Sequence, residues 1–187
     1  MIEISFVAGE CFFAALWLLA RTAVWIRQRG VDWKREALLL LMYVNLAVMI
    51  RFSFFPMEKL DGRIQPLLFD PGSVLPFNIN LSPFVHMGDY VSEREELLNF
   101  IGNIALFIPS GIILPVLYGK LDSLMKVMGA GALLSVCVEL LQLPFSVRVS
   151  DVDDLIMNVC GIFIGYMLFR LVRSMVKRDK NGSRGGT

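Results

Sequence analysis

The chain has few charged residues, few cysteines and a single histidine. Of its 187 residues 19% are charged, and 18 Lys+Arg against 17 Asp+Glu leave a formal net charge of +1. A chain with so small a net charge has no overall electrostatic field that would attract acidic partners, so we expect no nucleic-acid binding. Cys11, Cys137 and Cys160 lack C-x-x-C spacing, and the histidine is His86. The sequence therefore indicates neither a disulfide framework nor a zinc site, and we expect no metal, no cofactor and small, buried cysteines.

Signatures of familiar hydrolases are also missing from the sequence. It contains no G-x-S-x-G, no H-E-x-x-H and no cysteine beside a histidine, which leaves no evident nucleophile with a base. We therefore favour a non-enzymatic function and assign no catalytic residue. The N-terminal segment has no basic n-region and no A-x-A-like cleavage site, so we expect its apolar run to remain as a membrane anchor.

Apolar residues dominate what is present. AVILMFWYC make up 56% of the chain before its 15 glycines are added, against about 45–50% with glycine included in soluble domains. Crossing a bilayer takes about 20 mostly apolar residues as a helix. Five runs qualify, at about 4–26, 37–55, 97–118, 123–143 and 154–173. We predict an all-α polytopic bundle in which residues 1–176 form a single transmembrane domain and 177–187 a disordered basic tail.

The cations indicate an orientation, because cytoplasmic loops are enriched in Lys and Arg. Eleven of the 18 fall on one side of the predicted bundle: Arg27, Arg29, Lys34, Arg35, Lys120, Lys126, Arg173, Lys177, Arg178, Lys180 and Arg184. Four fall on the other side: Lys59, Arg63, Arg94 and Arg148. We therefore expect a multi-pass protein of the bacterial cytoplasmic membrane with its N-terminus outside and its C-terminus in the cytoplasm. Arg21 and Arg170, near cytoplasmic span ends, are expected to be snorkelling anchors.

A long outer segment, 56–96, separates the second and third spans. Its five prolines and three glycines argue against a continuous helix. We expect its apolar pieces, 66–69 and 83–85, to lie at the membrane interface or to dip back into the bundle. Ser92-Glu93-Arg94-Glu95 has the form of a capping box, which predicts that the third helix starts there.

Polar residues recur at helical spacing near the outer ends of the last three spans. The candidate pocket residues are Asn99 and Asn103 in the third span, Glu139 and Gln142 in the fourth, Asp151, Asp154 and Asn158 at the fifth, and Arg51 and Arg148 at the same depth. Ionisable groups inside a bilayer are normally turned into the bundle, so we expect one outward-facing polar pocket. Two structural interpretations remain open: in one the aspartates cap the fifth helix, and in the other the asparagines join helices by hydrogen bonds. Gly161 and Gly165 in the fifth span, and Gly129 and Gly131 in the fourth, are interpreted as close-packing positions.

Several of these residues also form motifs. Asn80-Leu81-Ser82-Pro83-Phe84 is followed by N-x-x-L-F-x-P-x-G at 103–111, E-x-x-Q at 139–142 and D-x-D-D-x-x-x-N-x-x-G-x-x-x-G at 151–165. In this order the motifs resemble the VanZ-like family over about residues 40–170. The resemblance implies a bacterial multi-pass membrane protein, in a family named for a protein of glycopeptide resistance clusters that lowers susceptibility to teicoplanin. Its motif residues correspond here to Asn103, Glu139, Gln142, Arg148, Asp151, Asp154 and Asn158.

Three functional hypotheses follow. In the first, the pocket binds a membrane lipid, a lipid-linked cell-wall precursor or a lipoglycopeptide. The carboxylates of the protein would bind amines or hydroxyls of this ligand, and the arginines would bind its phosphate or carboxylate groups. In the second, the protein is a membrane enzyme that acts on a lipid-linked substrate by carboxylate acid–base or metal chemistry. In the third, the polar groups are interhelical hydrogen bonds of a structural or partner-binding protein. The first is our leading expectation.

Overall fold

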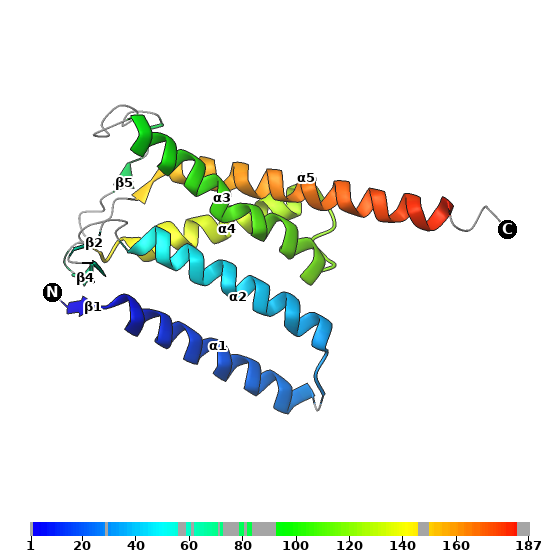
Figure 1. The fold of residues 1–187 in the computed structure, drawn as a ribbon, viewed down its shortest axis with the longest axis horizontal. Helices are drawn as coiled ribbons and strands as arrows, with labels where there is room; N and C mark the ends of the chain where they lie inside the picture. Colours follow the sequence, from blue (N-terminus) through cyan, green and yellow to red (C-terminus); the bar gives the residue numbers. More distant parts are fainter. Residues whose placement is uncertain are drawn as a thin grey trace.

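The computed structural model describes residues 2–28, 30–55, 59–60, 62–70, 72, 79–80, 82–83, 93–145 and 150–182. Its helices are α1 (Phe6–Gln28), α2 (Trp33–Phe54), α3 (Glu93–Leu117), α4 (Leu124–Gln142) and α5 (Val152–Gly182) (Figure 1). All five are long and apolar enough to cross a membrane. The predicted all-α bundle of five spans is therefore confirmed.

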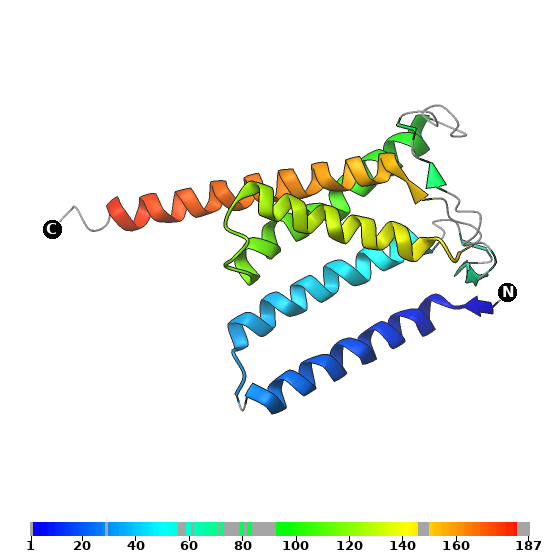
Figure 2. The same ribbon diagram turned by 180° about the vertical axis from the view of Figure 1, so that it is seen from behind.

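The helices run side by side, so the bundle has two ends (Figures 1 and 2). The strand end carries the N-terminus, the ends of α2 and α4 and the starts of α3 and α5. The turn end carries the short connections from α1 to α2 and from α3 to α4. An odd number of helices leaves the chain termini at opposite ends, as the predicted topology requires.

Short strands close the strand end. β1 (Ile2–Ile4) pairs antiparallel with β4 (Leu67–Phe69), β2 (Lys59–Leu60) pairs antiparallel with β3 (Arg63–Ile64), and β5 (Ile79–Asn80) pairs parallel with β6 (Ser150–Asp151). Between the end of α2 and the start of α3, the described residues accordingly form no α-helix. Leu67 is buried in the hydrophobic core, so the apolar piece at 66–69 packs against the bundle. In the other piece, 83–85, Pro83 alone lies within the described residues.

Glycines set the contact between α3 and α5. A methyl group on Gly161 would overlap the carbonyl oxygen of Ile104, and one on Gly165 would overlap that of Ile108. The two backbones therefore touch, which confirms the close-packing interpretation. In α4, Gly131 packs against the Ile162 side chain, whereas Gly129 has no heavy atom within 4 Å of the position a Cβ would take.

The expectation of buried cysteines is wrong. Cys11, Cys137 and Cys160 are all exposed on the surface of the bundle. The reason is that the outer surface of a membrane bundle faces lipid, which is as apolar as the interior. An apolar run in such a chain therefore does not tell which of its residues point inward.

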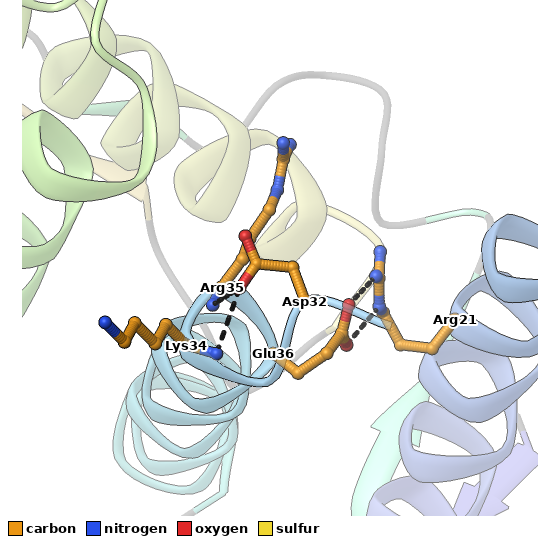
Figure 3. A network of polar contacts seen from close by, with 5 residues as sticks. All are labelled: Arg21, Asp32, Lys34, Arg35 and Glu36. Atoms are coloured by element: carbon orange, nitrogen blue, oxygen red, sulfur yellow. Dashed lines mark hydrogen bonds and ion pairs between the residues drawn. The ribbon is translucent and has the colours of Figure 1, made fainter. Parts of the chain in front are cut away.

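Arg21 is an ion-pair partner and not a snorkelling anchor (Figure 3). Its Nε donates to Glu36 Oε2 at 2.9 Å, and its Nη2 donates to Glu36 Oε1. The side chains are only 14% and 11% exposed, so each charge is compensated by the other within the membrane-spanning part. Beside them Asp32 caps α2, since its carboxylate accepts from the backbone N–H groups of Lys34 and Arg35.

The sequence predicted the start of α3 better than the end of α5. α3 begins at Glu93, where the capping box places its start; Ser92 lies outside the described residues. α5 continues to Gly182, so residues 177–182 are helical and their expected disorder is wrong. Lys and Arg are good helix formers, and extending an existing helix avoids the cost of nucleation.

Candidate functional site

Acidic residues of α4, β6 and α5 lie near one another at the strand end. Glu139 Oε2 accepts a hydrogen bond from the backbone N–H of Asp151 at 3.2 Å. Both carboxylate oxygens of Asp151 accept from Asn80 Nδ2, at 3.2 and 3.1 Å. The parallel pairing of β5 with β6 sets this register, because Asn80 and Asp151 are direct partners. Glu139, Asp151 and Asp154 are called the carboxylate cluster below.

Asp154 extends the cluster toward α3. Its Oδ1 accepts from Asn103 Nδ2 at 2.6 Å, which joins the two helices that also touch through their glycines. Asp151 in addition accepts from the backbone N–H of Asp153 at 2.9 Å, at the start of α5. Asp151 therefore both caps α5 and belongs to the cluster, because a carboxylate has lone pairs for several donors.

Two buried amides lie on the same faces of α4 and α5. Gln142 Nε2 donates to the carbonyl oxygen of Ser53 in α2 at 2.5 Å, and Asn158 Nδ2 donates to Ser135 Oγ in α4 at 2.9 Å. Gln142 is 5% exposed and Asn158 is 3% exposed. Their carbonyl oxygens, Gln142 Oε1 and Asn158 Oδ1, have no hydrogen-bond partner. Each amide therefore joins two helices and leaves a buried acceptor unsatisfied.

The remaining predicted pocket residues are Arg51, Asn99 and Arg148. The Arg51 guanidinium donates to the carbonyl of Phe55 at 3.1 Å and lies 5.6 Å from the ring centroid of Phe6 in α1. This places it on the α1 side of α2. Asn99 is exposed on α3. Arg148, like His86, is outside the described residues.

Sequence reasoning missed Asn45 and gave Asn80 no site role. Asn45 is buried in α2, donates to the carbonyl of Leu106 at 2.9 Å and accepts from Ser110 Oγ at 2.6 Å. A lone amide in the middle of the apolar run 37–55 was a usable signal, since polar residues inside spans usually face the bundle. Asn80 stands in the first motif, but its contact with Asp151 depends on strand pairing across about 70 residues.

The described contacts form two pairs that are near neighbours at the start of α5: Glu139 with the backbone of Asp151, and Asn103 with Asp154. Gln142 and Asn158 lie along the same helix faces. Among the described residues, no three His, Cys, Asp or Glu side chains form a group that could hold a metal ion. The arrangement is rich in acceptors and lies at one end of an otherwise apolar bundle. It is suited to binding a polar group by hydrogen bonds.

The residues of this site lie within a region of the chain that is similar to known proteins. A family model described as VanZ/LLP1 matches residues 37–173, which include most of α2, all of α3 and α4, and α5 as far as Arg173. The chain belongs to the VanZ-like family. Every described member of the carboxylate cluster lies within this VanZ-like region, and α1 precedes it.

A curated relative shows the same VanZ-like character. Protein VanZ of Enterococcus faecium is 31% identical over 103 residues, which are 55% of this chain and 59% of that protein. The chain therefore spans about three-fifths of the length of this relative. No solved structure gives a significant match.

Proposed function

We propose that this VanZ-like protein binds an amphiphile at the carboxylate cluster and thereby affects the response of the cell envelope to glycopeptide or lipoglycopeptide antibiotics. The observation that carries the proposal is that three acids lie at the strand end of the bundle: Glu139 bonds to the backbone of Asp151, and Asp154, three residues further along, bonds to Asn103 of α3. Glu139 and Asp154 fall within helices long and apolar enough to span a membrane. Charged groups in such segments are expensive, and in membrane proteins they commonly mark a binding site or pathway.

The surroundings of the cluster suit a molecule with both a head group and acyl chains. Leu140 and Leu141, which follow Glu139 directly, are 56% and 62% exposed on the outside of α4. Leu98 and Ile101 are similarly exposed near the start of α3. Acyl chains would cover these apolar surfaces while the head group reached the carboxylates.

Family membership supports the antibiotic part of the proposal. The relative is named Protein VanZ, and the VanZ-like family takes its name from a protein of glycopeptide resistance clusters. A lipid-linked cell-wall precursor and a lipoglycopeptide are both amphiphiles. Binding of either at this site would change how much of it is available at the membrane surface.

A structural role is the second candidate, favoured by the bonds from Asn103 to Asp154 and from Asn158 to Ser135. Each joins two helices. In this role the cluster serves to hold α3, α4 and α5 together. Isosteric substitutions of the acids distinguish the two candidates: they would weaken amphiphile binding in the first and would lower stability alone in the second.

The test is native mass spectrometry of the full chain purified in mild detergent, with teicoplanin and membrane lipids offered as ligands. We expect Glu139→Gln and Asp154→Asn to lower retention of a bound amphiphile about tenfold, the effect of losing one charged hydrogen bond. Asp122→Ala is the matched control, because Asp122 is exposed at the turn end. The hydrogen bond from Lys126 lowers the pKa of the Asp122 carboxyl, so this control also removes an ionised acid.

Two outcomes would contradict the proposal. One is a wild-type protein that retains no amphiphile from either class. The other is retention that stays unchanged in Glu139→Gln and Asp154→Asn while their thermal unfolding midpoints fall, which would establish the structural role.

A further inference from the structure

We infer that the head group taken up at this site carries a primary ammonium. The inference rests on the proposed function and narrows it to one class of lipid. Its basis is the chemistry of the polar atoms that α4 and α5 present: carboxylate oxygens and two buried amide oxygens. All of these accept hydrogen bonds, and a primary ammonium offers three donors and no acceptor.

Gln142 gives the firmest observation, because the orientation of its amide is fixed by its partner. The carbonyl of Ser53 has no hydrogen to give, so the Nε2 end of Gln142 must face it. Oε1 then points away from Ser53, in a side chain that is 5% exposed, and it has no partner. Buried carbonyl oxygens are nearly always paired, so one left unpaired indicates a missing donor.

The neighbours of Gln142 on α4 extend this acceptor surface. Ser135, Glu139 and Gln142 are spaced by four and three residues and therefore share one helix face. Glu139 lies one turn before Gln142 and presents a carboxylate, which favours a cationic donor over a neutral one. Asn158, bonded to Ser135, adds a second buried amide oxygen without a partner.

Asn45 shows that folding alone can satisfy a buried amide in this bundle. Its nitrogen donates to Leu106 and its oxygen accepts from Ser110, so both ends are paired at the contact between α2 and α3. The unsatisfied amides are instead Gln142 and Asn158, which lie on the faces that carry Glu139 and Asp154. Among the described residues, a buried acceptor without a partner also occurs in α1, at Glu10 Oε1. Of the buried amides described, however, the two that lack a donor are those on the faces of the carboxylate cluster.

The test compares phospholipids that differ in their N–H donors alone. Phosphatidylethanolamine, its N-methyl and N,N-dimethyl derivatives and phosphatidylcholine, with identical acyl chains, are offered to the full chain in mild detergent, and retention is measured by native mass spectrometry. We expect retention to fall stepwise with each methyl group and to be about tenfold lower for phosphatidylcholine, which has no donor. Phosphatidylglycerol, which is anionic, is expected to bind no better than phosphatidylcholine.

Variants connect this preference to the residues. Gln142→Met removes the amide with little change of size and is expected to reduce the preference for phosphatidylethanolamine several-fold, as is Glu139→Gln. Asn45→Leu is the matched control, because it also removes interhelical hydrogen bonds but lies away from the cluster; its preference should match that of the wild type. The methylation series on the wild type stands as a test even where Gln142→Met does not fold.

The outcomes separate the two proposals. Equal retention of all four lipids, with binding still lowered by Glu139→Gln, would overturn the ammonium inference and leave amphiphile binding standing; an ordered water would then be the donor to Gln142. A preference that persists unchanged in Gln142→Met and Glu139→Gln would also overturn it. Retention of no amphiphile would overturn the proposed function and the inference together.

Discussion

At the scale of single residues, the buried amides of this protein divide into two kinds. Asn45 has both ends of its amide bonded, whereas Gln142 and Asn158 each bond through nitrogen and leave an oxygen without a partner. In a membrane a hydrogen bond between helices contributes about 0.6 kcal/mol on average, because the separated helices find other partners. Satisfied amides such as Asn45 are therefore modest contributors to stability, and their main effect is on which helix faces meet.

Asn45 and Ser110 provide a direct measurement of this contribution. We expect Asn45→Ala and Ser110→Ala each to lower the free energy of unfolding, with a coupling in the double-mutant cycle of about 0.6–1.7 kcal/mol. Thermal or denaturant unfolding in detergent would give the four values. Strictly additive losses would show that the 2.6 Å contact between Ser110 Oγ and Asn45 Oδ1 contributes nothing measurable.

At the scale of elements, glycines explain why α3 and α5 pack so closely. Gly111, Gly161 and Gly165 lie where a methyl group would meet backbone atoms of the opposite helix. Backbone cannot move aside as a flexible side chain can, so these positions admit glycine alone without a shift of the helices. The same contact carries the bond from Asn103 to Asp154, so helix separation and site geometry are linked.

Gly161→Ala tests this link. We expect it to lower the free energy of unfolding by about 1–3 kcal/mol, the usual cost of overpacking, and to weaken amphiphile retention by moving Asp154 from Asn103. Gly129→Ala is the matched control, because the site of its Cβ is open; we expect it to change stability by less than about 0.5 kcal/mol. Equal effects of the two substitutions in thermal unfolding would contradict the packing argument.

At the scale of the whole molecule, four helices form the VanZ-like region and α1 is attached beside α2 (Figure 1). α1 is held by the ion pair from Arg21 to Glu36, by the stacking of Phe13 on Tyr43 at 5.1 Å and by pairing of β1 with β4. The strand end thus gathers the N-terminus, the segment after α2 and the carboxylate cluster. Of the cations that the structure describes, Arg27, Lys34, Arg35, Lys120 and Lys126 lie at or near the turn end, and Arg173, Lys177 and Arg178 lie in the C-terminal part of α5.

This arrangement predicts the orientation in the membrane. In a variant without native cysteines, we expect Arg63→Cys, at the strand end, to react with a membrane-impermeant maleimide added to whole cells. Lys120→Cys, at the turn end, should react after the cells are broken. A fluorescent protein fused to the C-terminus should fluoresce in the cytoplasm. The reverse labelling pattern would show that the strand end faces the cytoplasm.

The sequence alone predicted much of this arrangement, and the reasons differ between residues. Glu139, Asp151 and Asp154 were predicted together because polar residues at helical spacing must share a face, and a face of that kind avoids lipid. Arg51 was included with them by depth alone. The structure places its guanidinium over Phe6, since depth along a helix does not fix the direction of a side chain around it.

The sequence by itself determined the number of spans, their approximate limits, the family and the helix faces that carry the acids. These follow from length, hydropathy and residue spacing, all of which are local properties of the chain. The tertiary structure decided that Asn80 meets Asp151, that Arg21 meets Glu36, and that the cysteines point outward. Such outcomes depend on register between distant segments and on rotation of each helix about its axis. In a chain whose outside and inside are equally apolar, only the packed bundle specifies them.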